Sequence, residues 1–95
     1  MITHVEMKKS AQKEIEKAPV QVRRKFALWI SSVRMICLEK TRKFPSYHDE
    51  PLHGQRKGQR SIRLNDQWRA FYIIKNDETV EFVEIQEITA HEYKP

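Results

Sequence analysis

The spacing of apolar residues in the N-terminal half of the chain predicts one strand followed by two helices. Residues 2–7 alternate between polar and apolar, as a β-strand with one buried face does. Ser10 can cap a short helix, and the step from Ala18 to Pro19 ends it, because proline fits the first turn of a following helix. A longer second helix is predicted from one continuous apolar stripe. The stripe consists of Val22, Phe26, Trp29, Ile30, Val33, Ile36 and Cys37.

Beyond residue 43 the pattern changes from helical to extended. Residues 44–51 contain two prolines and are predicted to form an irregular loop. Segments 61–64, 68–75 and 79–88 are rich in β-branched and aromatic residues, and connections of hairpin length join them. The predicted fold is α+β, a single domain over residues 1–95 with the order β-α-α-β-β-β. Its antiparallel sheet carries both helices on one face and leaves the other face for function.

Composition indicates a folded protein that stays inside the cell. The chain has 95 residues, of which 33% are charged and 39% hydrophobic. No apolar run approaches the ~20 residues of a transmembrane helix. Glu6, Lys8 and Lys9 stand where the apolar stretch of a signal peptide would lie. Cys37 is the single cysteine, so no internal disulfide forms. We therefore expect a reduced, cytoplasmic protein without a membrane segment.

The positive charge is unevenly distributed along the chain. Residues 1–44 hold eleven Lys and Arg against four Asp and Glu, whereas residues 76–95 hold one against six, in a chain of net charge +5. A basic body followed by an acidic final fifth favours a polyanionic partner such as nucleic acid. The alternative is that these cations are ordinary solvated side chains.

The basic segment between residues 51 and 65 is the first candidate for chemistry. It contains two glycines, which let a backbone approach a ligand closely, and no acidic residue. Arg63 is expected to point away from the core, since its neighbours Ile62 and Leu64 point into it. Arginine and lysine are good phosphate donors. The candidate phosphate-binding residues are Arg56, Lys57, Arg60 and Arg63.

Arg69 is a second candidate because it is a cation in an otherwise apolar strand. It is expected to share one face with Phe71 and Ile73. Desolvating a guanidinium without a partner costs several kcal/mol, so this side chain must reach solvent, a carboxylate or a phosphate. A structural salt bridge to Glu81 or Glu84 on the neighbouring strand is one possibility, and a bound phosphate is the other.

The C-terminal segment offers a pair of residues for proton transfer. His91 titrates near neutral pH, and Tyr93 carries a weakly acidic hydroxyl. In an extended tail these two side chains would project to the same side. Thr89 and Glu92 also match a capping box, which would start a helical turn and separate them. The sequence leaves both conformations open.

A metal site is not expected. His48, Asp49, Glu50 and His53 carry suitable ligand atoms, but Pro51 prevents the helix that would bring the two histidines together. Their spacing matches no zinc pattern. A solvated loop is the favoured interpretation, with no metal or other cofactor.

The ordered set of elements and motifs resembles the RelE/ParE superfamily of bacterial toxins. The resemblance covers essentially the whole chain and is most specific in residues 52–93. It is closest to the HigB-like and RelE-like branches. The motifs that carry it are Leu-His-Gly-Gln-Arg-Lys-Gly-Gln-Arg-Ser-Ile-Arg-Leu at 52–64, Gln-Trp-Arg-Ala-Phe-Tyr at 67–72, Glu-Ile-Gln-Glu-Ile at 84–88 and His-Glu-Tyr at 91–93.

The resemblance implies an endoribonuclease, the mRNA interferase of a type II toxin–antitoxin pair. Such toxins enter the A site of the 30S ribosomal subunit and cut mRNA without a metal, and a cognate antitoxin blocks them. Operator DNA would be bound only through the antitoxin. The family's basic residue on the second strand corresponds to Arg63, its third-strand arginine to Arg69, the HigB-like loop lysine to Lys57 and the RelE-like tyrosine to Tyr93. His91 corresponds to a histidine found near the tail in several branches.

The chain departs from the family pattern at two places. Ser61 stands where RelE-type toxins carry a second basic residue, and their tail arginine has no counterpart. Metal-free RNA cleavage needs a base for the 2′-hydroxyl, an acid for the leaving oxygen and positive charge at the phosphorane. Arg69, His91 and Tyr93 are therefore the catalytic candidates, and which group is acid and which is base stays open.

Three alternative functions remain on the same fold. A ParE-like toxin would inhibit DNA gyrase without enzymatic activity, a plain RNA-binding module would cause no growth arrest, and an inactivated toxin would retain only the scaffold. Fold alone does not separate them, because function depends on the site. The basic segment together with the His91 and Tyr93 pair favours the nuclease.

Overall fold

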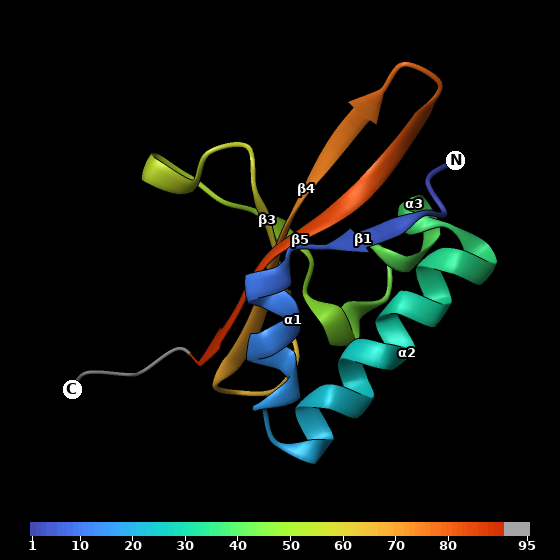
Figure 1. Ribbon diagram of the computed structural model, residues 1–95. Helices are drawn as coiled ribbons and strands as arrows, with labels where there is room; N and C mark the ends of the chain where they lie inside the picture. Colours follow the sequence, from blue (N-terminus) through green and yellow to red (C-terminus); the bar gives the residue numbers. More distant parts are fainter. Residues whose placement is uncertain (91–95) are drawn as a thin grey trace.

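The computed structural model describes residues 1–90 (Figure 1). These residues form one five-stranded sheet, three α-helices and two short 3₁₀ helices. The elements follow in the order β1 (Val5–Met7), α1 (Lys9–Glu16), α2 (Val20–Ile36), α3 (Leu38–Thr41), η1 (Pro45–Tyr47), β2 (Glu50–Pro51), η2 (Gly54–Arg56), β3 (Arg60–Arg63), β4 (Trp68–Asp77) and β5 (Val80–Ala90).

The spatial order of the strands is β1-β5-β4-β3-β2. The predicted antiparallel meander of β3, β4 and β5 is confirmed. The prediction of a fully antiparallel sheet is wrong in one respect, because β1 lies parallel to β5 and makes the sheet mixed. Alternation of residues identifies a strand, but it contains no information on the direction of the partner strand.

The loop predicted over residues 44–51 contains regular structure. Pro45 starts the 3₁₀ helix η1, and Pro51 belongs to β2, which pairs with β3 at the edge of the sheet. A proline is tolerated in an edge strand because its missing N–H can face away from the ladder. The two prolines therefore shape this segment without preventing regular elements.

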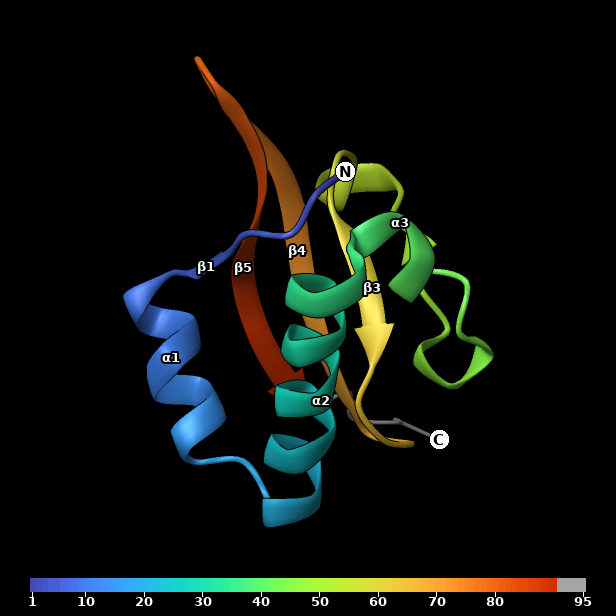
Figure 2. The same cartoon turned by 90° about the vertical axis from the view of Figure 1, so that its right-hand side faces the viewer.

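Both longer helices lie on one face of the sheet, as predicted (Figure 2). On α2 the buried residues are Val22, Phe26, Trp29 and Val33. The Trp29 ring packs 5.4 Å from the ring of Tyr72 on β4, which joins the helix to the centre of the sheet. Within residues 1–90, no helix combines the length and the apolar character needed to cross a membrane.

The helix ends differ from the predictions. Lys8 rather than Ser10 is the N-cap of α1, and Pro19 is the N-cap of α2 rather than part of its first turn. Ile36 is exposed although it belongs to the predicted stripe. Helix α2 ends there because Cys37 adopts a positive φ of 96° and directs the chain into α3, which was not predicted.

A β-bulge adjusts which residues of β5 face the core. Phe71 pairs with Glu87 and Tyr72 pairs with Ile85, so that Gln86 is an extra residue in β5. Because of this insertion, Ile85 and Ile88 are both buried although they are three positions apart, a step that would place them on opposite faces of a regular strand. The bulge therefore keeps Val83, Ile85 and Ile88 together on the helix-covered face.

Candidate nucleic-acid interface

The uncovered face of the sheet carries two arginines directly opposite each other. Arg63 on β3 and Arg69 on β4 are partners in the antiparallel ladder. Arg63 is exposed while its neighbours Ile62 and Leu64 are buried, so its predicted orientation is confirmed. Like charges directly opposite each other destabilise a sheet. The fold therefore brings two positive charges together at this end of β3 and β4.

Backbone carbonyls hold the Arg69 side chain in place. One guanidinium nitrogen donates to the carbonyl oxygen of Asn65 at 2.6 Å and to that of Trp68 at 3.0 Å. The turn itself is fixed, because the Asn65 side chain accepts hydrogen bonds from the backbone N–H groups of Gln67 and Trp68. Arg69 is thus positioned by the β3–β4 turn.

Neither glutamate predicted as a salt-bridge partner lies opposite Arg69. Thr89 occupies that position on β5, whereas Glu84 lies opposite Ile73. The Glu84 carboxylate instead approaches Lys75 at 3.6 Å. The bulge and the length of the β4–β5 hairpin set this register, and the sequence pattern does not reveal either.

Lys25 on α2 adds a third cation that sequence reasoning missed. Its ammonium donates to the carbonyl oxygen of Ser46 at 2.8 Å and lies 5.3 Å from the ring centroid of Tyr47. Burial lowers the pKa of Lys25, and the charges of Arg63 and Arg69 lower it further. The charges of Arg63 and Arg69 therefore act on Lys25, and we call these three residues the cationic cluster. No local motif marks Lys25, since only the docking of α2 brings it there.

Arg56 reaches the same face of the sheet but already has protein partners there. Its guanidinium forms an ion pair with Glu87 at 2.7 Å and donates to the Gln59 side chain at 3.2 Å. It also lies over the ring of Phe71, 4.3 Å from the centroid. Phe71 follows Arg69 by two positions on β4, on the same face. Arg56 is thus close to the arginine pair but held by other groups.

Arg60, also predicted to bind phosphate, is part of an internal ion pair. Its Nε donates to Asp49 Oδ1 at 2.6 Å, and the Tyr72 hydroxyl donates to Asp49 Oδ2 at 2.5 Å. The Asp49 side chain is 0% exposed, so the interpretation of residues 48–50 as a solvated loop is wrong for Asp49. Burial raises the pKa of Tyr72 above its usual value, and the hydrogen bond to Asp49 raises it further.

Lys57 lies apart from the cationic cluster. It is exposed in the loop between η2 and β3, where Gly58 adopts a φ of 96° that favours glycine. This loop is at the opposite end of β3 from the β3–β4 turn that holds Arg69 (Figure 1). His91 and Tyr93 lie outside the described residues, which end at Ala90, opposite Trp68.

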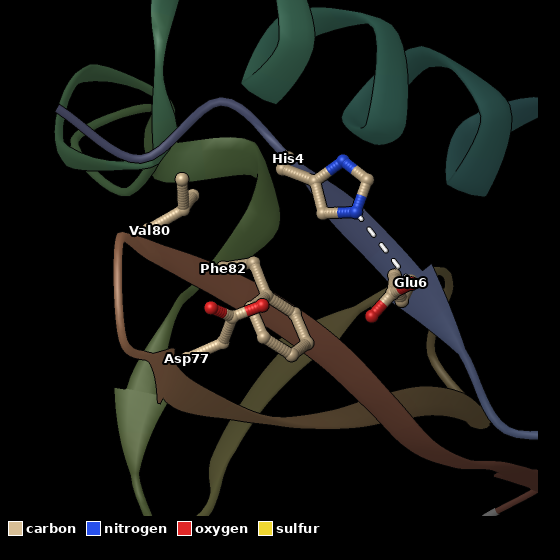
Figure 3. Close-up of a pocket in the computed structure, with 5 residues that line it drawn as sticks. All are labelled: His4, Glu6, Asp77, Val80 and Phe82. Carbon is tan, nitrogen blue, oxygen red and sulfur yellow. Dashed lines mark ion pairs between the residues drawn. The ribbon is translucent and has the colours of Figure 1, made fainter.

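A separate pocket of about 380 Å³ opens where β1 meets the β4–β5 hairpin (Figure 3). His4 forms an ion pair with Glu6 at 3.7 Å and packs its ring edge against Phe82. Asp77 and Val80 complete the lining, which in the described chain includes no lysine or arginine. Two carboxylates make this pocket unsuitable for a phosphate. Among residues 1–90 there is no group of three His, Cys, Asp or Glu that could hold a metal ion.

Solved structures of several toxins are similar to this chain. A YoeB/ParE toxin from Agrobacterium tumefaciens matches with a TM-score of 0.68 and 17% identity over 94% of this chain and 99% of that chain. YafQ from E. coli matches with a TM-score of 0.68 and 18% identity over 90% of each chain. A chain of the archaeal RelE–RelB complex from Pyrococcus horikoshii matches with a TM-score of 0.66 and 17% identity, over 95% of this chain and 96% of that one.

These similarities establish the fold. The chain has the α+β fold of RelE/ParE-type toxins, as its sequence predicted. No protein-family model and no curated sequence matches the chain. None of the three structures is described as HigB-like, so that branch remains a prediction.

Proposed function

We propose that the chain is the toxin of a type II toxin–antitoxin system and acts as an endoribonuclease on mRNA in the A site of the 30S subunit. The observation that supports it most is the cationic cluster, in which Arg63 and Arg69 face each other across β3 and β4 and Lys25 on α2 is close enough to feel their charge. Three neighbouring cations favour a polyanionic ligand, because arginine and lysine side chains supply the contacts that bind phosphates.

The proposed reaction uses the 2′-hydroxyl of RNA as an internal nucleophile, which DNA lacks. The 2′-oxygen attacks the adjacent phosphorus, the bond to the 5′-oxygen breaks, and the products are a 2′,3′-cyclic phosphate and a 5′-hydroxyl. A base removes the 2′-proton and an acid protonates the leaving oxygen. We assign these two proton transfers to His91 and Tyr93, in either order.

Arg69 is the proposed stabiliser of the phosphorane charge. Two carbonyl oxygens fix one of its nitrogens, so the guanidinium is oriented before the substrate arrives. A group that is already oriented stabilises developing charge without reorganising during the reaction. Arg63 and Lys25 would position the scissile phosphate, with Lys57 contacting the RNA backbone farther along β3.

The proposed protein partner is a cognate antitoxin. One structure with this fold is a RelE–RelB complex. An antitoxin segment with acidic residues would complement the cationic cluster and exclude RNA from it. Binding to operator DNA would then occur through the antitoxin, and the toxin itself would contact no membrane.

The test compares Arg69→Gln with Arg34→Gln, an equal loss of charge at an exposed position of α2. Each variant is expressed in a bacterial host without antitoxin, and growth, protein synthesis and the 5′ ends of cut mRNA are measured. We expect Arg69→Gln to lower mRNA cleavage about 10²-fold, as the loss of one oriented charge-stabilising donor does. Arg34→Gln should arrest growth like the wild type.

Two outcomes would contradict the proposal. One is undiminished cleavage by an Arg69→Gln protein whose thermal unfolding is normal. The other is growth arrest with intact mRNA and broken chromosomal DNA, which would indicate a gyrase inhibitor. The latter is the second candidate function, since one of the similar structures carries the name ParE.

A further inference from the structure

We propose that Arg56 forms a stacking platform for an unpaired RNA base, supported from below by Phe71 and held in place by Glu87. The inference rests on the proposed function in taking single-stranded RNA as the ligand. It assigns to Arg56 a role different from phosphate binding, and it defines a base subsite next to the cationic cluster.

Three contacts fix the Arg56 guanidinium. The Phe71 ring lies beneath it, with 4.3 Å between the guanidinium carbon and the ring centroid. One nitrogen pairs with the Glu87 carboxylate at 2.7 Å, and another donates to the Gln59 side chain at 3.2 Å. A cation over an aromatic ring, tied at two further nitrogens, has little freedom to rotate. Its planar group is thereby preorganised.

The Arg56 side chain remains partly accessible despite these contacts. The Arg56 side chain is 41% exposed and the Glu87 side chain 35%. A phosphate would have to compete with Glu87 for the N–H groups of Arg56, whereas a base would stack on the side of the guanidinium plane away from Phe71 and leave that ion pair intact. RNA-binding proteins commonly stack unpaired bases on arginine planes and aromatic rings. The contacts therefore suit a base better than a phosphate.

The position of the platform agrees with this role. Phe71 and Arg69 lie on one face of β4, two residues apart, and the strand rise places their Cα atoms about 7 Å from each other. One nucleotide of extended RNA can span this separation. An RNA strand whose phosphate lies at the cationic cluster can thus place a neighbouring base on Arg56.

The experiment measures binding of the full chain to short single-stranded RNA carrying 2′-O-methyl groups, which cannot be cleaved by 2′-hydroxyl attack. A second set of oligonucleotides lacks one base at successive positions. We expect removal of the stacked base to weaken wild-type binding about fivefold or more. With Arg56→Lys, which keeps the charge but not the plane, this loss should fall below about twofold while the salt dependence stays the same.

Phe71→Leu provides a second variant in case the lysine alters the η2 loop, since it removes the supporting ring and changes no charge. For Phe71→Leu, too, we expect removal of the stacked base to weaken RNA binding by less than about twofold. The inference is overturned if both variants respond to abasic RNA like the wild type, if the wild type binds intact and abasic RNA equally, or if it binds no RNA. A protein that cuts mRNA but shows no dependence on the base keeps the proposed function and loses only the platform.

Discussion

At the scale of single residues, Asp49 joins a connecting segment to the sheet. Its carboxylate accepts hydrogen bonds from Arg60 on β3 and Tyr72 on β4, and its side chain is 0% exposed. Breaking a buried pair by removing one partner is costly, since the other charge stays desolvated. Asp49 therefore contributes to stability rather than to metal or substrate binding.

Replacing Asp49 with alanine should lower the free energy of unfolding by roughly 2–4 kcal/mol, because Arg60 and the Tyr72 hydroxyl lose their shared acceptor. Urea denaturation measures this change. Glu50→Ala is the matched control, since this neighbouring carboxylate is exposed. The control should change the free energy of unfolding by less than about 0.5 kcal/mol. Equal effects of the two substitutions would show that the Asp49 network adds no stability.

Tyr72 leads to a prediction on the pH dependence of stability. Burial and then the hydrogen bond to Asp49 raise its pKa in the folded state above the ordinary value of 10.0. The contribution of Tyr72 to the free energy of unfolding is therefore complete below pH 10. It is lost as the pH rises further, because above pH 10 the unfolded chain releases the hydroxyl proton more readily than the folded chain does. Lys25, whose pKa is lowered, acts in the opposite direction.

The matched comparison is between the wild type and Tyr72→Phe, since the Lys25 contribution is common to both. Unfolding free energies are measured from about pH 8 to about pH 11. The wild type should lose more stability than Tyr72→Phe above pH 10. Parallel pH curves for the two proteins would contradict the assignment.

At the scale of elements, periodicity predicted α2 and its buried face correctly. Val22, Phe26, Trp29 and Val33 are all buried at helical spacing. The pattern was less informative at the helix ends, because a cap depends on a few backbone contacts. For example, the N–H of Lys8 donates to the carbonyl oxygen of Ile85, a contact outside the helix.

The same periodicity gives a prediction for α2. Trp29→Ala should destabilise the protein by about 3–5 kcal/mol, because this fully buried ring fills the space between α2 and β4. Met35→Ala on the same helix should change stability by less than about 0.5 kcal/mol, since Met35 is 82% exposed. Thermal unfolding followed by circular dichroism compares them. A Trp29→Ala protein as stable as Met35→Ala would mean that α2 does not pack as described.

At the scale of the whole molecule, charge of opposite sign gathers at different places. The cationic cluster lies beside the β3–β4 turn, whereas Glu6 and Asp77 line the pocket near the β4–β5 hairpin. The separation orients an approaching polyanion toward the cluster.

Arg63→Gln should weaken RNA binding, because it removes one cation of the cluster. The slope of log affinity against log salt for single-stranded RNA should become shallower by about 0.7, the value for one lost phosphate contact. Lys13→Gln, an equal charge change at an exposed position of α1, should leave this slope unaltered. An unchanged slope in Arg63→Gln would show that Arg63 contacts no phosphate.

The sequence by itself determined the order of the main elements, the helix-covered face and the outward direction of Arg63. These properties depend on residues that are close together in the sequence. The apolar residues among them recur with a period of 3.6 in a helix or 2 in a strand, and this period is visible in the sequence. The strand direction of β1, the bulge at Gln86 and the short elements at Pro45 and Pro51 were not predictable in this way.

Only the tertiary structure decided which side chains meet. Lys25 reaches Ser46 across 21 positions, Tyr72 reaches Asp49 across 23, and Arg56 reaches Glu87 across 31. Local patterns contain no information on such pairs, because they depend on how α2 docks on the sheet and on the register of its strands. The pairing of β3 and β4 and the docking of α2 thus create the cationic cluster, and they bring Lys25, which no local pattern marks, to two arginines that the sequence had singled out.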